Sequence, residues 1–413
     1  MVSEDVPHPN LGGLGKHALA LAAALNRRGH EVDVLGNAGC PIEHHPEQSG
    51  PGRFIAGISG HARGWKTRKL GMYLPMRVSM NGKSVARAIL AHAARYDIVH
   101  YHGHLPWVAA ELPKGISFLQ SRHDQGGDCM INTRFLATAK RCTSVDPLAC
   151  AGCATKQPNV IQKLVSTHTV RLMRNRTNNG YARHPTIFVS HFLQQGFARA
   201  AGGEVSGTVL HNAVDTESLE AALTSVEPTA TRQFNGIELF SAGVIAPHKG
   251  YGELLLQLEQ DPLPDSTTLT IAGDGPLLAD FRAKSQARSV SLLGWKKYAD
   301  IVRMIARADA VVVPSVADEP CATTILEALA LGRTVYALDR GGSRELQRYT
   351  SAGGAALKLF PGMVELVTAL KGHAQQLPFA TSVNPEFGAT MHALAEQVER
   401  HYEQMLFTKR GDR

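Results

Sequence analysis

Hydrophobic positions follow two alternating spacings along the first half of the chain. "GKHALALAAALNRRGH" carries apolar residues at helical spacing and ends at Gly29, and "EVDVLG" then alternates as a short strand. "YDIVHYHG" (96–103) and "ISFLQSRHD" (116–124) are typical of buried strands, and "PTIFVSHFLQQGF" (185–197) predicts a strand that leads into a helix capped by Ser190. Strands that alternate with helices indicate a parallel sheet with right-handed crossovers.

The second half repeats the pattern. Strands are predicted in "IELFSAGV", "TLTIAGDG", "SVSLLGW", "ADAVVVPS" and "RTVYALD". A length of 413 residues also exceeds one ordinary core, so we expect two α/β domains, residues 1–212 and 213–384. The helical segment 385–413 is expected to pack back on the first domain. Only residues 1–3 precede the first turn, so the first strand is either a stub or continues upstream.

Composition indicates a globular protein, with 44% hydrophobic residues. No apolar run approaches the roughly 18 residues that cross a bilayer, and the start "MVSEDVPHPNLGG" has neither a basic region nor an apolar core of a secretory leader. We therefore expect a cytoplasmic protein.

Charge is divided unequally between the two halves. Residues 1–204 hold 24 Lys and Arg against 12 Asp and Glu, and the totals of 43 and 36 leave 19 and 24 for the remainder. A net charge of +12 followed by −5 suggests an anionic partner. The basic and aromatic stretch "RGWKTRKLGMYLPMR" (63–77) suits an anionic membrane surface on the inner face, and a solvated loop with buried anchors explains it equally. We expect no nucleic-acid partner, because no zinc finger, RNP-like aromatic pair or heptad repeat is present.

Two glycine- and lysine-containing loops are candidates for phosphate binding. "GGLGKH" (12–17) lies between a strand end and a helix, where glycines let backbone amides approach an anion. Its spacing is not the dinucleotide fingerprint, and a plain tight turn is the alternative. "SAGVIAPHKG" places Lys249 after a strand, where it could neutralise a diphosphate or simply be solvated.

The segment "EPCATTILEALALG" (319–332) is more specific. Its small residues leave the first amides of a helix unobstructed, and such amides attract an anion. Glu319 precedes that helix, and Glu327 on its second turn could accept two hydroxyl protons, as carboxylates do with ribose. Two solvated glutamates are the alternative.

Together these motifs resemble the family 4 retaining glycosyltransferases (glycosyl transferases group 1) across nearly the whole chain. The resemblance is carried by "GGLGKHALALAAALNRRGHEV", "YDIVHYH", "HNAVD", "SAGVIAPHKG", "IAGDGP", "LLGW" and the segment from "VVPSVADEPCATTILEALALG" to "GGSREL", which contains the E-x7-E pattern. It implies an α/β GT-B fold, with two Rossmann-like parallel-sheet domains facing a central cleft.

The resemblance also implies residue roles. Glu327 would hold ribose hydroxyls and Glu319 hydroxyls of the donor sugar, while the amides of Ala322, Thr323 and Thr324 would bind the diphosphate of a UDP- or GDP-sugar. The remaining implied contacts are Lys249 and Gly13 at the diphosphate and His123 near the transferring sugar, although a lone histidine at a strand end is more often a satisfied core residue.

One departure concerns the diphosphate. The family has Arg after the glycine at Gly243, where this chain has Val244, so one contact is missing or supplied elsewhere, with Arg344 as a candidate. No cofactor is expected for catalysis, because amides and a lysine can stabilise the leaving diphosphate.

Four cysteines cluster in the first half: Cys129, Cys142, Cys150 and Cys153. Their spacing, with "CAGC", is compatible with structural zinc. Reduced thiols in an acceptor-side loop are the alternative, since a cytosolic setting disfavours disulfides.

We therefore expect a retaining hexosyltransferase that uses an NDP-sugar and a glycan or lipid-linked acceptor, in cell-surface polysaccharide or glycoconjugate biosynthesis. A nucleotide-sugar epimerase of the same fold and a non-catalytic sugar-nucleotide binder are the competing hypotheses.

Overall fold

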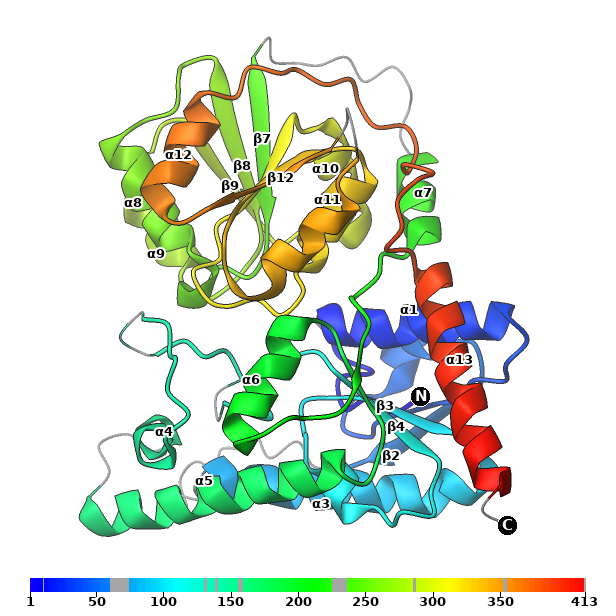
Figure 1. Ribbon diagram of the computed structural model, residues 1–413. Coiled ribbons are helices and arrows are strands. Elements are labelled where there is room, and N and C mark those ends of the chain that lie inside the picture. Colours follow the sequence, from blue (N-terminus) through cyan, green and yellow to red (C-terminus); the bar gives the residue numbers. More distant parts are fainter. Residues whose placement is uncertain are drawn as a thin grey trace. The chain divides into compact units, whose positions relative to one another are not determined.

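The computed structural model describes residues 1–9, 11–59, 74–129, 132–136, 138, 140–154, 159–224, 236–284, 287–351 and 355–411 (Figure 1). The chain divides into two compact units. The first unit comprises Met1–Leu136, Cys142–Asn212 and Met391–Arg413, and the second comprises Ala137–Arg141 and Ala213–Thr390. The short segment Ala137–Arg141, which the sequence analysis assigned to the first domain, is thus grouped with the second unit.

The first unit is built on a parallel sheet. Its strands are β1 (Val34–Asn37), β2 (Phe54–Ile58), β3 (Val99–His102), β4 (Phe118–Arg122), β5 (Thr186–Phe188) and β6 (Thr208–Val209). Val2 forms parallel bridges with both Leu35 and Tyr101, so the order is β2-β1-Val2-β3-β4-β5-β6. The predicted first strand is therefore reduced to bridges at one residue, in the middle of the sheet.

Helices cover both faces of this sheet. They are α1 (Gly13–Arg27), α3 (Leu74–His92), α4 (Pro147–Ala154), α5 (Val160–Tyr181), α6 (His191–Ala201) and α13 (Met391–Gly411). Figure 1 shows α1 and α13 on one side of the sheet, and α3 and α5 on the other. The predicted cap of α6 is confirmed, because the Ser190 side chain accepts a hydrogen bond of 3.2 Å from the Leu193 amide.

The second unit holds a six-stranded parallel sheet in the order β12-β11-β10-β7-β8-β9. The strands are β7 (Ile237–Ala242), β8 (Thr267–Ala272), β9 (Val290–Gly294), β10 (Ala310–Val313), β11 (Thr334–Leu338) and β12 (Leu357–Phe360). The helices are α7 (Thr216–Thr224), α8 (Tyr251–Gln260), α9 (Leu278–Lys284), α10 (Tyr298–Arg307), α11 (Thr323–Ala330) and α12 (Met363–Lys371). Because the chain winds outward in both directions from β7 and β10, the topological switch point lies between these two strands.

The predicted two-domain α/β architecture with parallel sheets is confirmed. Strands β2, β6 and β12 were not predicted, and all three lie at the edges of their sheets. The basic and aromatic residues of segment 63–73 lie outside the described residues. None of the described helices combines the length and the apolarity needed to cross a membrane.

Gly250 fixes the loop between β7 and α8. Its φ of +75° lies in the left-handed region, and a Cβ atom there would meet the Pro314 carbonyl oxygen at 1.9 Å. Pro314 follows β10, and the Ala317 amide donates to the His248 carbonyl at 3.1 Å. The loops after β7 and β10 therefore pack directly on each other, through a glycine that no other residue could replace without strain.

We predict that Gly250→Ala lowers the free energy of unfolding of the second unit by about 2 kcal/mol or more, because it combines left-handed strain with a backbone clash. The change is measured as a shift in urea or thermal unfolding. Gly388→Ala is the control, since a Cβ at Gly388 meets nothing within 4 Å. Equal effects of the two substitutions would contradict the prediction.

Candidate functional site

Two loops of the second unit meet at the switch point of its sheet. The loop after β7 carries the short helix Pro247–Lys249, and the loop after β10 carries Glu319 ahead of α11. β7 and β10 are neighbouring parallel strands, so both loops leave the same edge. In open parallel sheets this is the position where ligands bind.

Lys249 and Glu319 form an ion pair across these loops. The Lys249 Nζ atom lies 2.5 Å from Glu319 Oε1, and the Ser315 hydroxyl donates to the same oxygen at 2.9 Å. Burial by itself would raise the pKa of Glu319, but the Lys249 ammonium and the two hydrogen bonds outweigh it and hold the pKa below its ordinary value. Glu319 is therefore a charged acceptor whose position is fixed from two loops.

A glycine pair supports the backbone of Glu319. Gly341 has a φ of +57°, and a Cβ there would meet the Glu319 carbonyl oxygen at 2.3 Å. The Gly342 amide donates to that carbonyl at 2.8 Å, and the Gly341 amide donates to Asp318 Oδ1 at 3.1 Å. The "GG" that follows β11 thus holds the Glu319 loop through close backbone contact.

Helix α11 begins directly after this loop. Its N-cap is Ala322, which has no side-chain oxygen, and within the described residues no side chain caps the helix. Thr323 and Thr324 occupy the first two helical positions and are partly exposed. The first amides of α11 can therefore accept an anion at the positive end of the helix dipole.

Glu327 lies on the second turn of α11. Its Oε1 atom accepts a hydrogen bond of 3.0 Å from the hydroxyl of Tyr298, the first residue of α10. Burial, together with the Glu327 carboxylate, raises the pKa of that phenol. Tyr298 thus orients a partly exposed carboxylate, a group that can accept hydrogen bonds from the hydroxyls of a diol.

In the first unit, Gly12 and Gly13 begin α1 at the carboxyl edge of the sheet. Gly12, the N-cap, has a φ of −80°, and a Cβ at either glycine would meet nothing within 4 Å. Neither backbone strain nor crowding by the protein explains these glycines. They leave the backbone at the start of a 15-residue helix accessible to an anionic group.

Histidines gather at the same edge of the first sheet. His102 ends β3, His123 follows β4, and His17 lies one turn into α1. His102 Nδ1 lies 3.1 Å from His123 Nε2, and His123 Nδ1 lies 3.1 Å from Asn212 Oδ1. Because an amide oxygen only accepts, Nδ1 of His123 carries the proton, and Nε2 accepts from His102. His102 and Asn212 therefore set the tautomer and the orientation of His123.

Burial keeps these imidazoles neutral. It lowers the pKa of His102 and His123 well below the ordinary value and lowers the pKa of His17 to about 4. Ligand nitrogens of the three histidines lie within 4.8 Å of one another, and among the described residues this is the group that could hold a metal ion. The hydrogen bonds from His123 to His102 and to Asn212 join these three side chains in one network.

Within the described residues, Cys129, Cys142, Cys150 and Cys153 do not form a group that could hold a metal ion as the histidines could. None of the four forms a disulfide, and they do not bring three ligand atoms within 4.8 Å in the described part of the chain. Burial raises the pKa of Cys150 and Cys153, and Arg174 Nη2 donates to Cys150 Sγ at 3.3 Å. As placed, the thiols do not form a tetrahedral zinc site, and structural zinc stays a prediction.

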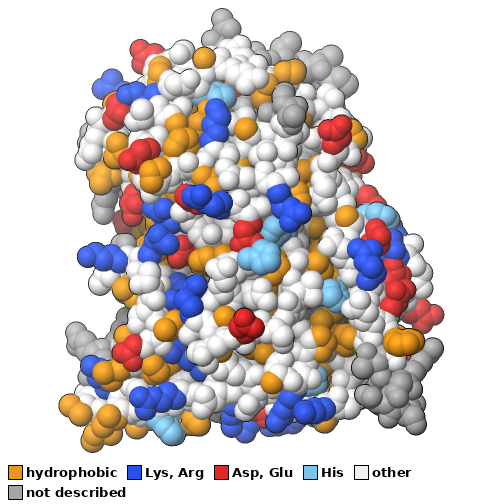
Figure 2. All heavy atoms as spheres, viewed as in Figure 1, with side chains coloured by type: hydrophobic (Ala, Val, Ile, Leu, Met, Phe, Trp, Pro, Cys, Tyr) orange, Lys and Arg blue, Asp and Glu red, His pale blue; other side chains and the backbone are white. Residues whose placement is uncertain are grey.

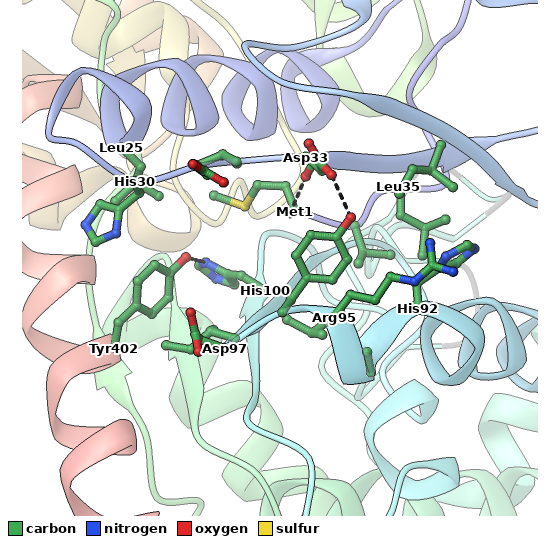
Figure 3. Close-up of a pocket in the computed structure, with 18 of the residues that line it drawn as sticks. Met1, Leu25, His30, Asp33, Leu35, His92, Arg95, Asp97, His100 and Tyr402 are labelled. Carbon is green, nitrogen blue, oxygen red and sulfur yellow. Dashed lines mark hydrogen bonds between the residues drawn. The ribbon is translucent and has the colours of Figure 1, made fainter.

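A cavity of about 550 Å³ lies elsewhere in the first unit. It is lined by residues that precede β1 and β3, including Met1, Asp33 and Asp97, and thus opens at the amino ends of the strands. Figure 3 shows His100 directed at Tyr402, whose hydroxyl lies 2.7 Å from His100 Nδ1. Ligands of such sheets bind at the carboxyl ends, so the volume of this cavity does not make it the active site.

The structure therefore groups the predicted residues into two sets. In the second unit, Lys249 and Glu319 are in contact, and Glu327 follows on α11. In the first unit, Gly13 and His123 lie at one sheet edge. Val244 is 52% exposed, and Arg344 forms an ion pair with Asp339, so its suggested diphosphate role remains untested.

Sequence reasoning missed the residues that position these groups. Tyr298, Ser315 and His102 contact the predicted side chains from other loops and strands. A usable signal existed for Asn212 in "HNAVD" and for His102 in "YDIVHYH", because both motifs were quoted for the resemblance. Ser315 likewise lies in the quoted segment "VVPSVADEPCATTILEALALG", whereas Tyr298 had no comparable signal.

We predict that the first unit loses stability in acid partly through His17. Burial lowers the pKa of His17 to about 4 in the folded chain, against about 6.5 in the unfolded chain. Between these two pH values the unfolded chain binds a proton that the folded chain does not, so stability falls as the pH falls. Between pH 7.5 and 5.5, the wild type should lose about 1 kcal/mol of unfolding free energy more than His17→Gln. Urea unfolding at both pH values measures this, with the exposed His44→Gln as control. An identical pH dependence of wild type and His17→Gln would contradict the prediction.

Two family models match the chain. The glycosyltransferase family 4 model matches residues 11–218, and the glycosyl transferases group 1 model matches residues 238–368. Among curated proteins, a glycosyltransferase of Methanocaldococcus jannaschii is 23% identical over 366 residues, covering 86% of this chain and 83% of that protein. Glycogen synthase of Mycobacterium tuberculosis is 25% identical over 360 residues, covering 84% of this chain and 78% of that protein.

Solved structures share the fold. Anabaena HepE in complex with UDP-glucose is 18% identical, with a TM-score of 0.57 over 98% of each chain. WaaG, a glycosyltransferase involved in lipopolysaccharide biosynthesis, is 14% identical, with a TM-score of 0.55 over 97% of this chain and 95% of that chain. The two parallel-sheet units therefore form a GT-B fold, and the chain is a glycosyltransferase that belongs to family 4.

Proposed function

We propose that this glycosyltransferase transfers a hexosyl unit from a UDP- or GDP-sugar to a glycan or lipid-linked acceptor, with retention of anomeric configuration. The observation that carries the proposal is the order of groups at the switch point of the second unit. A cation at Lys249, a fixed carboxylate at Glu319, the uncapped start of α11 and the carboxylate of Glu327 follow one another there.

This order matches the chemistry of a nucleotide sugar. The α11 amides and Lys249 would neutralise the diphosphate, and Glu327, oriented by Tyr298, would accept hydrogen bonds from the ribose hydroxyls. Glu319 would accept hydrogen bonds from hydroxyls of the donor sugar. That HepE is described in complex with UDP and with UDP-glucose supports a nucleotide-sugar donor here.

The proposed reaction needs no metal for departure of the leaving group. Amides and an ammonium aimed at the diphosphate stabilise the negative charge that develops as the glycosidic C–O bond breaks. The acceptor hydroxyl attacks the same face of an oxocarbenium-like carbon, and the departing phosphate oxygen takes its proton. Gly13 and the neutral His123, held by His102 and Asn212, are the groups that the first unit would contribute.

The proposal includes the setting of the reaction. A net charge of +12 in residues 1–204 against −5 in the remainder favours a peripheral position on the anionic inner face of a membrane, where lipid-linked acceptors for cell-surface polysaccharides reside. Membrane attachment would leave the protein otherwise cytoplasmic.

Two alternatives use the same residues. Val244, in place of the usual arginine, motivates a sugar-nucleotide binder without turnover, and the fold is shared with nucleotide-sugar epimerases. Incubation with labelled UDP- and GDP-sugars separates the three: release of NDP that depends on acceptor supports transfer, interconversion of sugars supports an epimerase, and binding alone supports the binder. A thermal-shift screen of donors identifies the nucleotide, because a bound ligand stabilises the folded state.

We predict that Glu319→Gln reduces turnover by about 10²-fold or more, because it removes a charged acceptor aimed at the donor sugar. The substitution keeps the side-chain shape but removes the ion pair with Lys249, so the melting temperature is measured beside the rate to separate lost turnover from unfolding. Initial rates of NDP release measure the effect, and Glu365→Gln on the exposed face of α12 is the matched control. Unchanged turnover in Glu319→Gln would remove Glu319 from the proposed site.

We further predict that Val244→Arg tightens the binding of UDP or GDP by about tenfold, as expected for one added charge-assisted hydrogen bond. Val244 is 52% exposed, so an arginine fits without repacking the core. Calorimetric titration with the nucleotide measures the dissociation constant. Val364→Arg, at a 57% exposed valine of α12, controls for added net charge. Equal affinities of the two variants would show that Val244 does not face the diphosphate.

A further inference from the structure

Helix α5 of the first unit presents an unusual outward face. Val160, Ile161 and Leu164 are 76%, 73% and 63% exposed, and Val165 and Leu172 on the same helix are also exposed. At roughly 100° per residue, these five side chains fall on one half of the helix. The lower left corner of Figure 2, over the start of α5 in Figure 1, shows hydrophobic side chains gathered beside Lys and Arg.

The inward face of α5 is more polar than the outward one. Ser166, Thr167, Arg174 and Thr177 are buried against the protein, together with Val170 and Met173. Val170 and Met173 pack with Trp107 and Cys150. A surface helix normally places its apolar stripe toward the core, so the first turns of α5 have the reverse polarity. An apolar stripe that faces outward indicates a surface that is covered in the working protein.

The charged residues of α5 indicate what kind of partner this face can bind. Helix α5 contains Lys163, Arg171, Arg174 and Arg176 and neither Asp nor Glu. Lys163 and Arg171 are exposed, whereas Arg176 lies 3.5 Å from Glu111. The adjacent α4 contains no charged residue. The exposed face is therefore both apolar and cationic.

A second copy of the chain fits this face poorly. A two-fold contact would bring Lys163 and Arg171 of both copies together, and the helix offers no carboxylate to neutralise them. An anionic bilayer fits it well, because apolar side chains enter the interfacial region while cations meet lipid phosphates.

We propose that the outward face of α5, made of Val160, Ile161, Leu164, Val165, Lys163 and Arg171, docks this glycosyltransferase on an anionic membrane. The inference deepens the membrane part of the proposed function by naming the surface that binds. It depends on neither the donor nor the acceptor.

The test is flotation of the full chain with vesicles of phosphatidylcholine, alone or mixed with phosphatidylglycerol. The wild type should float with the mixed vesicles at low ionic strength. Ile161→Asp combined with Leu164→Asp should weaken this binding by at least about tenfold, because two apolar side chains leave the interface. Leu256→Asp, at a 56% exposed leucine of α8 in the second unit, is the matched control and should bind like the wild type.

A second variant separates the charges from the apolar side chains. Lys163→Gln combined with Arg171→Gln should reduce binding to mixed vesicles by roughly fivefold for each charge and leave binding to phosphatidylcholine alone unchanged. Added salt should reproduce this loss in the wild type.

Three results would overturn the inference. One is a wild type that fails to float with mixed vesicles at low ionic strength. Another is an aspartate pair that binds them like the Leu256→Asp control. The third is a wild-type dimer in sedimentation velocity that the aspartate pair dissociates, because the face would then join two copies. The thermal shift given by UDP or GDP, measured on each variant, reports folding and donor binding separately, so failure of membrane docking is distinguishable from failure of the proposed transfer.

Discussion

The ion pair between Lys249 and Glu319 is the interaction on which the second unit's site depends. A partly buried carboxylate is costly unless a cation and hydrogen-bond donors compensate it, and Glu319 receives both from Lys249 and Ser315. The pair is possible only because β7 and β10 are neighbours, so that loops separated by about seventy positions in the chain leave one edge together. The order of strands in the sheet therefore determines that Lys249 and Glu319 can meet.

Glycines turn that strand order into fixed loop positions. Gly250 brings the Lys249 loop against Pro314, and Gly341 and Gly342 hold the backbone of Glu319 from the loop after β11. Each of these contacts is made by backbone, which leaves the side chains of the site free for hydroxyl and phosphate chemistry. In the first unit Gly12 and Gly13 differ, because the protein itself does not crowd them. Their accessibility is what a ligand would require.

Local patterns were sufficient to predict the fold class and five strands of the second sheet. Alternating apolar residues around β7, β8 and β10 could be read directly, and the cap at Ser190 followed from a serine before a helical pattern. The contact of Lys249 with Glu319 was not predictable from spacing, because it depends on which strands pair. Tyr298 was missed for the same reason: its partner Glu327 lies 29 positions away on another helix. The structure was also needed to show that the apolar side of α5 faces outward, since its sequence alone does not say which side of the helix is packed.

Helix α13 has a consequence for the order in which the protein can be assembled during synthesis. It packs on α1 within the first unit, where Glu399 pairs with Arg28 and with His30, and Tyr402 contacts His100. These partners lie 302 to 371 positions apart in the chain, so the first unit cannot complete its native contacts until α13 has been synthesised. The central part of the second unit, Ala213–Thr390, is continuous in the chain and emerges earlier. The half of the enzyme that is made first is thus finished last, and during that interval α1 exposes the apolar surface that α13 will cover.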